Sequence, residues 1–449
     1  MVGETEVTAG VSGDEGRATF RSILGNREYR YLLSANVFSW IGDYLSRAAV
    51  TVLVLQSSGS VALSAASFAL SYLPWLVGGP LLATIAERLP FRSTMVVCDL
   101  LRMLLIGLVA LPGMPLWGMF ALLLGTAMAN PPFQAARSAL LPQVLTGDRL
   151  VLGLAMQQST GQAAQIIGFA AGSTLAGIDP RTALMVNSLT FGISALLIRF
   201  GLHDRRPIGI SAARRPLLRE TADGFRIIWN SRVMRGIAIL VFATMFFGVV
   251  PEGLAAGWAQ TLAGGRGNTG WMQAMIMVAS PIGMIVGGLV VGRLLSSEQR
   301  RRAIPVFAVL TPLALVPALF APPVYVVSLM AFVCGFMGAS MFPAANGLFV
   351  EVLPAGYRAR AFGVMQTGVQ VAQGVAVLAT GVMADRFPLP VVVGAWSVGG
   401  VLLTLAVALR WPSNAEIGQE IEANRRAADA RPTEPQTTRT ESTKGAEHG

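Results

Sequence analysis

The chain has few of the residues on which soluble enzymes rely. Among its 34 Lys plus Arg the only lysine is Lys444, and its 449 residues include two histidines and two cysteines. A phosphate-binding loop of the form G-x-x-x-x-G-K-[ST] is therefore absent, which excludes a pump that hydrolyses nucleotides in that way. His203 and His448 lie outside the apolar segments, so histidine-based triads and imidazole metal clusters are excluded there. We therefore expect a protein without nucleotide hydrolysis, metal or other cofactor.

Charged residues are also scarce. Only 13% of the residues are charged and 53% are hydrophobic, with a mean hydropathy of +0.59, which is too apolar for a water-soluble domain. Apolar runs recur along the chain, and many reach the length of about 20 residues that a helix needs to cross a bilayer. We predict about twelve membrane-spanning helices, near residues 30–55, 62–84, 94–112, 116–137, 151–175, 183–201, 234–257, 270–292, 304–320, 324–348, 361–384 and 389–410.

The arginines are unevenly distributed. The formal net charge is +10, and arginines crowd the long central loop at 202–233 and the connections that follow the second, eighth and tenth apolar segments. All these connections lie on one side of the membrane, so the positive-inside rule places them and both termini in the cytoplasm. The charge therefore orients a multi-pass protein in a cell membrane, inner or plasma, and does not indicate a nucleic-acid partner.

The two halves of the chain are related by a constant offset. Asp43 and Glu252 are separated by 209 residues. The same offset relates further pairs, namely Gly79 and Gly288, Arg92 and Arg301, Gln157 and Gln366, and Gly172 and Gly381. Such a register indicates a duplication, and parallel six-helix repeats are one known transporter architecture, with the binding site between the repeats. We predict an all-α membrane protein of two pseudo-symmetric six-helix bundles.

This organisation divides the chain into five parts. We expect a cytoplasmic N-terminal segment (1–29), two six-helix bundles (30–201 and 234–410), a basic cytoplasmic linker with an amphipathic helix between them (202–233), and a disordered cytoplasmic tail (411–449).

Charges inside the apolar segments point to a working site. An ionisable residue at the centre of a membrane helix costs roughly 2.5–3.5 kcal/mol on insertion scales, so it usually has a partner or a function. Arg47 lies one turn after Asp43, so the two form either a self-neutralising pair or a site where Asp43 exchanges a proton. Glu252 follows Pro251, which opens the backbone. Glu252 is either a second proton carrier or a water-facing residue at the outer end of its helix.

Polar and aromatic side chains near these charges are candidates for a substrate cavity. Arg137, Gln157 and Gln366 supply hydrogen-bonding groups, although amides in membrane helices commonly bond one helix to another. Trp40 and Phe247 supply aromatic surface for an apolar compound, although core packing explains such residues equally well. These five residues complete the predicted cavity.

One stretch carries a family resemblance. The segment GGPLLATIAERLPFRSTMVVCDLLR resembles the cytoplasmic loop signature of the major facilitator superfamily, with Gly79, Glu87, Arg88 and Arg92 at the signature positions. Acidic and basic groups at helix ends can pair in one conformation and separate in another, as a gate requires. The predicted gate is extended by two further residues, Asp99 and Arg102.

Three further stretches resemble the drug-exporting, macrolide-efflux-like branch of that superfamily. They are WIGDYLSRAAVTVLVLQSSGS, PPFQAARSALLPQVL and RETADGFRIIWNSRVMRGI, and the resemblance covers roughly residues 20–410. Three departures are visible. In the loop signature Glu87 replaces the usual aspartate and Ala83 stands where the family has a second glycine. IIGFAAGS keeps the antiporter glycines Gly168 and Gly172 but has Phe169 at the proline position.

The resemblance implies secondary active efflux of an amphipathic compound, a drug, antibiotic or similar natural product, coupled to proton entry. We expect a monomer that works by alternating access, with protons, this substrate and the lipid bilayer as its partners. The alternatives are an importer or uniporter of the same fold, and a transport-inactive membrane receptor or scaffold. The identity of the substrate is not encoded in a recognisable pattern.

Overall fold

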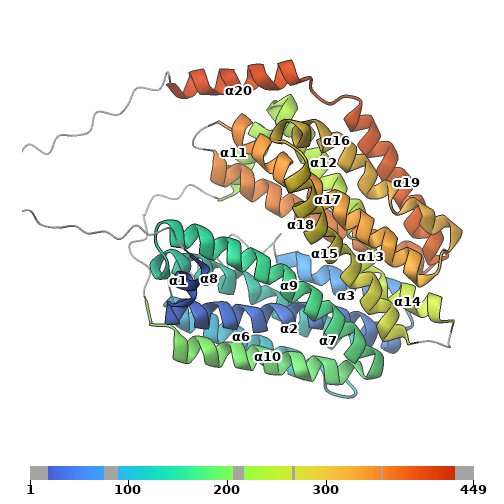
Figure 1. Cartoon of the computed structure of the whole chain (residues 1–449). Coiled ribbons are helices and arrows are strands. Elements are labelled where there is room, and N and C mark those ends of the chain that lie inside the picture. Colours follow the sequence, from blue (N-terminus) through green and yellow to red (C-terminus); the bar gives the residue numbers. More distant parts are fainter. Residues whose placement is uncertain (1–18, 75–88, 206–216, 265–267, 355–356, 430–449) are drawn as a thin grey trace, which may run out of the picture.

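A computed structural model describes residues 19–74, 89–205, 217–264, 268–354 and 357–429. Within these ranges every regular element is a helix (Figure 1). The N-terminal half contains α1 (Phe20–Leu24), α2 (Arg27–Ser58), α3 (Val61–Ala69), η1 (Leu70–Tyr72), α6 (Phe91–Val109), α7 (Leu116–Met128), α8 (Asn130–Val144), α9 (Asp148–Ile178) and α10 (Pro180–Gly201).

The C-terminal half follows a linker helix. Its elements are α11 (Leu217–Asn230), α12 (Arg232–Gly248), α13 (Val250–Gly253), α14 (Ala255–Ala263), α15 (Thr269–Leu294), α16 (Ser297–Leu313), η2 (Val316–Phe320), α17 (Val324–Val352), α18 (Arg358–Ala384), α19 (Leu389–Ala408) and α20 (Asn414–Asp429). Each predicted apolar segment overlaps at least one of these helices. By length and hydropathy, eight spans among the described residues can cross a membrane, which confirms an all-helical membrane protein and leaves the exact number of spans open.

Helix α2 carries most of the predicted site, and local signals fix both its ends. The side chain of Asn26 caps its first turn by accepting a hydrogen bond from the backbone N–H of Tyr29 at 3.2 Å. Gly59 ends the helix in the left-handed region, with φ of 68°, a conformation that costs glycine little. Between these ends lie 32 residues, enough to cross a bilayer with some tilt.

The glycines of α9 allow it to pack closely on α2. A Cβ added at Gly168 would lie 2.7 Å from the carbonyl oxygen of Ile41, and one at Gly172 would lie 2.6 Å from that of Leu45. Phe169, which stands at the motif's proline position, is fully buried and meets the Tyr44 ring edge to face, with 5.1 Å between centroids. These residues therefore fix the seam between α2 and α9, so that small residues set the approach of two helices within one bundle.

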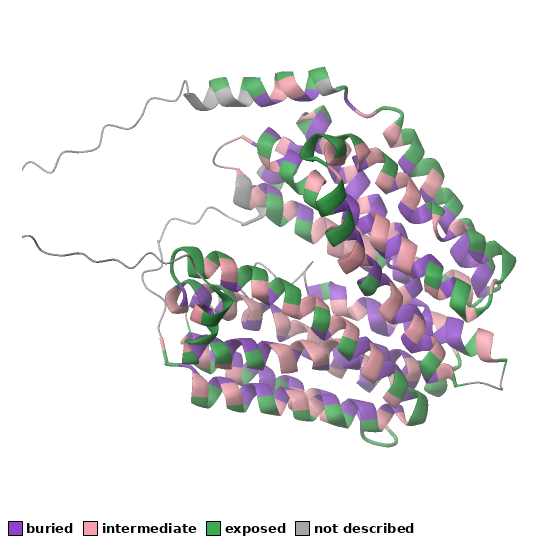
Figure 2. Ribbon diagram, in the orientation of Figure 1, coloured by how far each residue is buried: buried purple, intermediate pink, exposed green. Residues whose placement is uncertain are grey.

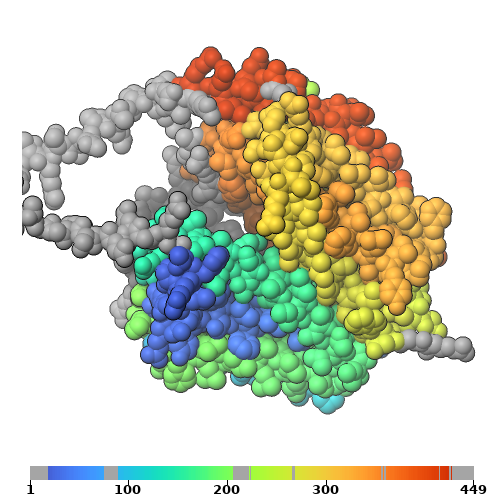
Figure 3. Space-filling model, in the orientation of Figure 1, coloured from blue at the N-terminus to red at the C-terminus, as the bar shows by residue number. Residues whose placement is uncertain are grey.

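The two bundles meet at one end of the molecule and diverge at the other (Figures 1 and 3). At the end where they meet, which we call the closed end, the amide of Gln273 on α15 donates to the carbonyl of Ala48 on α2 at 3.1 Å. Nearby, the Asp385 carboxylate after α18 accepts hydrogen bonds from the Ser60 hydroxyl at 2.6 Å and the Ala62 N–H at 3.0 Å.

Buried residues run through the helices of both bundles (Figure 2), and one core cluster joins the bundles where they meet, with Phe169 of α9 and Trp258 of α14 among its members. Close backbone contact supports this seal, because a Cβ at Gly270 on α15 would lie 2.7 Å from the Cα of Gly177 on α9. The end that carries α1 and α11, which we call the open end, lies on the other side of these contacts (Figure 1). The two bundles therefore form a V, in contact at the closed end and apart at the open end (Figure 1).

The C-terminal tail differs from the prediction. Residues 411–449 were expected to be disordered, but 414–429 form α20. Ile417 and Ile421, one turn apart, are buried against the C-terminal bundle, and Glu416 accepts a hydrogen bond from Arg232 at 2.9 Å. The expectation was wrong for α20 because a polar average composition concealed an amphipathic repeat. Residues 430–449 lie outside the described ranges.

Candidate functional site

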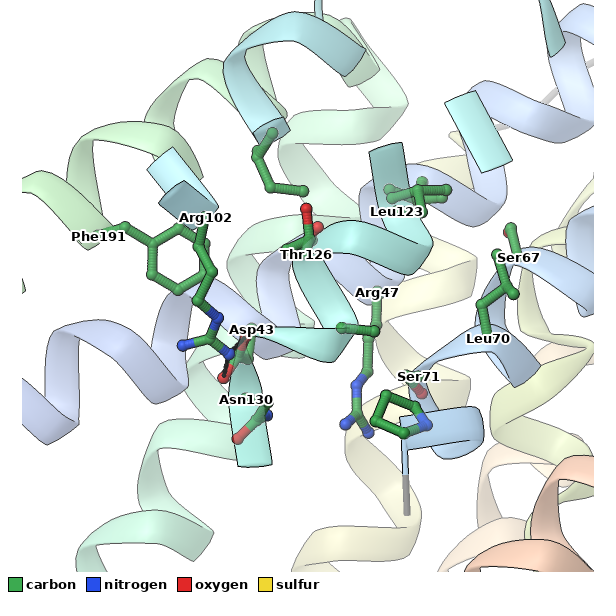
Figure 4. A pocket seen from close by; sticks show the side chains of 15 residues that line it. Asp43, Arg47, Ser67, Leu70, Ser71, Arg102, Leu123, Thr126, Asn130 and Phe191 are labelled. Atoms are coloured by element: carbon green, nitrogen blue, oxygen red, sulfur yellow. Dashed lines mark hydrogen bonds and ion pairs between the residues drawn. The ribbon is translucent and has the colours of Figure 1, made fainter. Parts of the chain in front are cut away.

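A buried arginine from α6 holds the aspartate of α2. The Nη2 atom of Arg102 donates to both carboxylate oxygens of Asp43, at 2.7 and 2.9 Å (Figure 4). The Arg102 side chain is 2% exposed and that of Asp43 is 20% exposed, so the pair lies deep in the N-terminal bundle. A charge-assisted bond of this kind is among the strongest available to side chains, and here little water competes with it.

A second carboxylate approaches the same guanidinium. Asp99 lies one turn before Arg102 on α6, fully buried, with its Oδ1 atom 3.5 Å from Nη1 of Arg102. Its other oxygen accepts from the Ser194 hydroxyl of α10 at 2.6 Å, and Arg102 Nη1 donates to Ser39 at 3.1 Å. Two carboxylates thus share one guanidinium. We call Asp43, Asp99 and Arg102 the charge cluster.

The predicted Asp43–Arg47 pair is wrong. Arg47 points away from Asp43 toward the side of the cavity where Ser71 lies, and its guanidinium carbon lies 5.4 Å and 5.8 Å from the ring centroids of Tyr44 and Tyr72 (Figure 4). Spacing along one helix favoured a local pair, but Arg102 from a neighbouring helix reaches Asp43 instead.

Asp43, Arg47 and Arg102 line a cavity of about 70 Å³, which we call the Asp43 cavity. Apart from these charges, its polar lining consists of short side chains: Ser46, Ser67, Ser71, Thr126 and Asn130. Hydroxyl groups of this kind both donate and accept hydrogen bonds, so they suit a small hydrated space. The Asp43 cavity is large enough for a few waters and too small for a drug-sized compound.

A larger cavity lies beside it, between α2, α8 and α9. It measures about 290 Å³ and is lined by Trp40, Tyr44, Arg137, Gln157 and other residues of α9, and we call it the Trp40 cavity. The guanidinium of Arg137 lies 5.0 Å from the Trp40 ring centroid. Arg137 Nη1 and Gln157 Nε2 are buried without hydrogen-bond partners among the described residues. The predicted residues Trp40, Arg137 and Gln157 are therefore brought together around unpaired donors.

Glu252 lines a third cavity, of about 150 Å³, which we call the Glu252 cavity. Glu252 itself lies on the short helix α13, between α12 and α14. Pro251, which has no backbone N–H, interrupts the backbone hydrogen bonding there as expected. Ser280 of α15, Gln165 of α9 and Gln373 of α18 are among the polar residues that line this cavity. Glu252 is therefore a partly buried residue facing both bundles, and it does not stand in open water at a helix end.

The two predicted proton carriers do not share one cavity. Asp43 faces the Asp43 cavity and Glu252 faces the Glu252 cavity, and the two cavities share no lining residue among the described residues. Two other predicted cavity residues lie elsewhere. Phe247 is buried in an aromatic cluster with Phe246 and Trp396, at 5.1 and 5.8 Å between centroids, and Gln366 is exposed on α18 outside these three cavities. Aromatic side chains pack in cores as readily as they line cavities.

The predicted gate is only partly described. Gly79, Glu87 and Arg88 lie outside the described residues. Arg92 pairs with Asp204 after α10 at 3.5 Å, whereas Asp99 and Arg102 belong to the charge cluster around Asp43. The extension of the gate by the latter two residues is therefore wrong.

Sequence reasoning missed a network near Arg92. Glu28 at the start of α2 accepts from Arg205 after α10, at 2.7 and 2.9 Å, and from the backbone N–H of His203 at 3.1 Å. The available signal was a lone acidic residue at the start of an apolar helix, where an anion is favoured by the helix dipole. This network ties the first and last helices of the N-terminal bundle together at the open end.

Comparisons with known proteins agree with this architecture. The family model of the Major Facilitator Superfamily matches residues 32–324 and 253–441. The multidrug efflux pump Tap of Mycobacterium tuberculosis is 24% identical over 413 residues, which cover 86% of this chain and 94% of Tap. The lysophospholipid transporter LplT of Cronobacter sakazakii is 26% identical over 281 residues, 62% of this chain and 68% of LplT.

Solved structures share the fold. The crystal structure of the nucleoside transporter NupG superposes with a TM-score of 0.65 at 16% identity, covering 86% of this chain and 100% of NupG. At this identity the likeness concerns the fold alone. The family model extends over both bundles. The chain belongs to the Major Facilitator Superfamily of membrane transporters.

Proposed function

We propose that this transporter exports an amphipathic compound in exchange for protons. The observation that carries the proposal is the charge cluster, in which Asp43 and Asp99 share the single guanidinium of Arg102 beside a small polar cavity. Two carboxylates and one arginine leave an excess negative charge in a low-dielectric bundle, and a proton neutralises it at the least cost. The likeness to Tap supports efflux.

The proposed proton step uses the geometry of the pair. A proton from the outer solution binds the Asp43 carboxylate and removes its charge, so the charge-assisted bonds from Arg102 weaken. Arg102 then turns toward Asp99, already 3.5 Å away, and the proton leaves Asp43 when the cavity faces the cytoplasm. The change at Asp43 reaches the other bundle through α2, where the Ala48 carbonyl accepts a hydrogen bond from Gln273 of α15 at 3.1 Å. Glu252 is the second proposed proton carrier.

The Trp40 cavity is the proposed substrate site. Its aromatic wall suits an apolar body, and the unpaired donors of Arg137 and Gln157 suit a polar end that accepts hydrogen bonds. Among the residues that the structure describes, the lining of this cavity contains no carboxylate. We therefore favour neutral, zwitterionic or anionic amphiphiles over simple cations. The likeness to LplT makes lysophospholipids one substrate class to test.

Substitutions at the Trp40 cavity test this site. Arg137→Ala, alone or with Gln157→Ala, is expected to raise the apparent KM for an amphiphile with an anionic head roughly tenfold, because a charge-assisted hydrogen bond is lost. A fluorescent lysophospholipid in proteoliposomes provides the measurement. Ser159→Ala is the matched control. Ser159 lies on α9, two residues after Gln157, its side chain is exposed, and its hydroxyl donates a hydrogen bond to the Ala155 carbonyl of the preceding turn. An unchanged KM in the Arg137 variant would remove the Trp40 cavity from substrate binding.

Alternating access is tested at the closed end. We infer that the open end is cytoplasmic, so the outward-facing form requires Ser60 and Asp385 to separate. Oxidation of a Ser60→Cys, Asp385→Cys variant is expected to reduce transport to background, and reductant is expected to restore it. The single Ser60→Cys variant, treated alike, controls for oxidation elsewhere. Full transport by the cross-linked protein would contradict the model.

One assay determines the direction in which the substrate moves and distinguishes the alternative functions. A fluorescent lysophospholipid and a fluorescent aromatic cation are each supplied to inside-out vesicles with an imposed pH gradient. Accumulation driven by the gradient supports export, and movement without a gradient indicates a uniporter. Movement only from the opposite side indicates an importer. Binding without movement in any of these conditions indicates a receptor or scaffold.

A further inference from the structure

A basic groove lies on the outside of the C-terminal bundle, far from the three interior cavities. It forms where α12 begins and α19 ends, and measures about 330 Å³. Three arginines line it, Arg232, Arg235 and Arg410, together with Trp411 and the aliphatic wall of Ile239, Leu403, Ala406 and Val407. We call it the α12–α19 groove.

Gly236, Trp411 and Pro412 line the groove beside the arginines. Gly236 lies one turn into α12, and a Cβ added there would lie at ordinary van der Waals distance from its neighbours, 3.5 Å from the Trp411 ring and 3.9 Å from Pro412. Trp411 spans the gap with its ring half-buried, the position that tryptophan favours at the boundary between lipid tails and headgroups.

The charges of the groove are only partly compensated. Arg232 pairs with Glu416 of α20 at 2.9 Å, and Arg235 donates to the backbone carbonyl of Trp229 at 3.2 Å. The guanidinium of Arg410 is exposed and has neither a hydrogen bond nor an ion pair with the described residues. The groove therefore holds three positive charges against one negative charge, beside the positive end of the α12 dipole.

The groove continues onto surface that faces the membrane. On α19, Leu402 is 64% exposed and Leu403 46% exposed, in a helix apolar enough to span the bilayer. An occupant thus meets cationic groups at one end and hydrocarbon at the other. A free anion uses only the basic end, whereas a phospholipid uses both.

We propose that the α12–α19 groove binds an anionic phospholipid. The phosphate lies between Arg235 and Arg410, whose planar guanidinium groups match phosphate oxygens, and an acyl chain follows Leu403 and Ile239. Basic pockets between membrane helices near the cytoplasmic surface bind acidic headgroups in this way. The bound lipid bridges α12 and α19 next to the Arg232–Glu416 pair that holds α20, so it stabilises this end of the bundle.

The test uses the full chain, delipidated and reconstituted in nanodiscs of phosphatidylcholine with or without phosphatidylglycerol. Native mass spectrometry measures retained phosphatidylglycerol, and the thermal unfolding midpoint measures its effect. Wild type is expected to retain phosphatidylglycerol and unfold at a higher temperature with it. In Arg235→Gln with Arg410→Gln, the apparent affinity is expected to fall roughly tenfold or more. The single Arg410→Gln variant, which breaks no contact among the described residues, is expected to show a smaller loss in the same direction.

The matched control removes the same charge elsewhere. Arg199→Gln with Arg300→Gln alters one exposed and one partly exposed arginine outside the groove and is expected to bind phosphatidylglycerol like wild type. Equal retention by the groove variants and this control would overturn the proposal, as would equal retention of phosphatidylcholine and phosphatidylglycerol by wild type. If inorganic phosphate alone raised the midpoint as much as phosphatidylglycerol, the groove would be an anion site and the lipid assignment would be wrong. None of these outcomes depends on proton coupling.

Discussion

Replacement of Asp43 by asparagine is expected to abolish transport driven by a pH gradient while the protein remains folded in the membrane. The amide has nearly the shape of the carboxylate and still accepts a hydrogen bond from Arg102, so the pair's geometry at 2.7 Å is largely kept. The amide cannot bind and release a proton near neutral pH, however, so the pH gradient can no longer drive transport through protonation of residue 43. The expected rate in proteoliposomes is that of protein-free vesicles.

Two measurements separate loss of coupling from general damage. Exchange of labelled for unlabelled substrate without a pH gradient is expected to continue in Asp43→Asn, because that exchange needs no net proton movement. Asp148→Asn is the control, since Asp148 is exposed at the start of α9, and it is expected to transport like wild type. Gradient-driven transport by Asp43→Asn at the wild-type rate would exclude Asp43 as the proton carrier and leave Asp99 or Glu252 to be tested by the same substitution.

The fold was readable from sequence because lipid imposes a strict rule. Backbone groups inside a bilayer must be paired within the segment, so long apolar runs such as Val324–Val352 can only be helices there. Gly168 and Gly172 were recognised in the sequence only as motif glycines, and the structure shows that their lack of a side chain allows α9 to pack closely on α2.

The site was only partly readable because its contacts are not local. The ion pair of Asp43 joins residues 59 positions apart, and helical spacing favoured Arg47 because it gives no information on which neighbouring helix faces α2. A charged Arg102 in an apolar segment, one turn from Asp99, was the available signal. Arg137 was identified through its polarity and lines a cavity. The aromatic signal selected both Trp40, which lines the same cavity, and Phe247, which packs in an aromatic cluster, so an aromatic residue alone does not distinguish a cavity wall from a core.

Removal of the charge of Arg102 is expected to be the most destabilising substitution in the chain's interior. Arg102→Met preserves much of the side chain's length but leaves Asp43 and Asp99 facing one another without a cation between them. Breaking a buried ion pair by removing one partner costs about 3–5 kcal/mol of unfolding free energy, because an uncompensated charge stays in a low dielectric. We therefore expect a large fall in the thermal midpoint in detergent.

A compensating variant distinguishes charge from packing. With Asp43→Asn and Asp99→Asn added to Arg102→Met, no charge remains in the cluster, and most of the lost unfolding free energy is expected to return. If the fall instead came from lost contacts with Phe191, whose ring centroid lies 4.6 Å from the guanidinium carbon, the triple variant would stay as unstable as Arg102→Met. Arg199→Met, at an exposed site, is expected to change little. Wild-type stability of Arg102→Met would show that the cluster is hydrated and its charges screened, so that a proton there would drive no movement of α6 against α2.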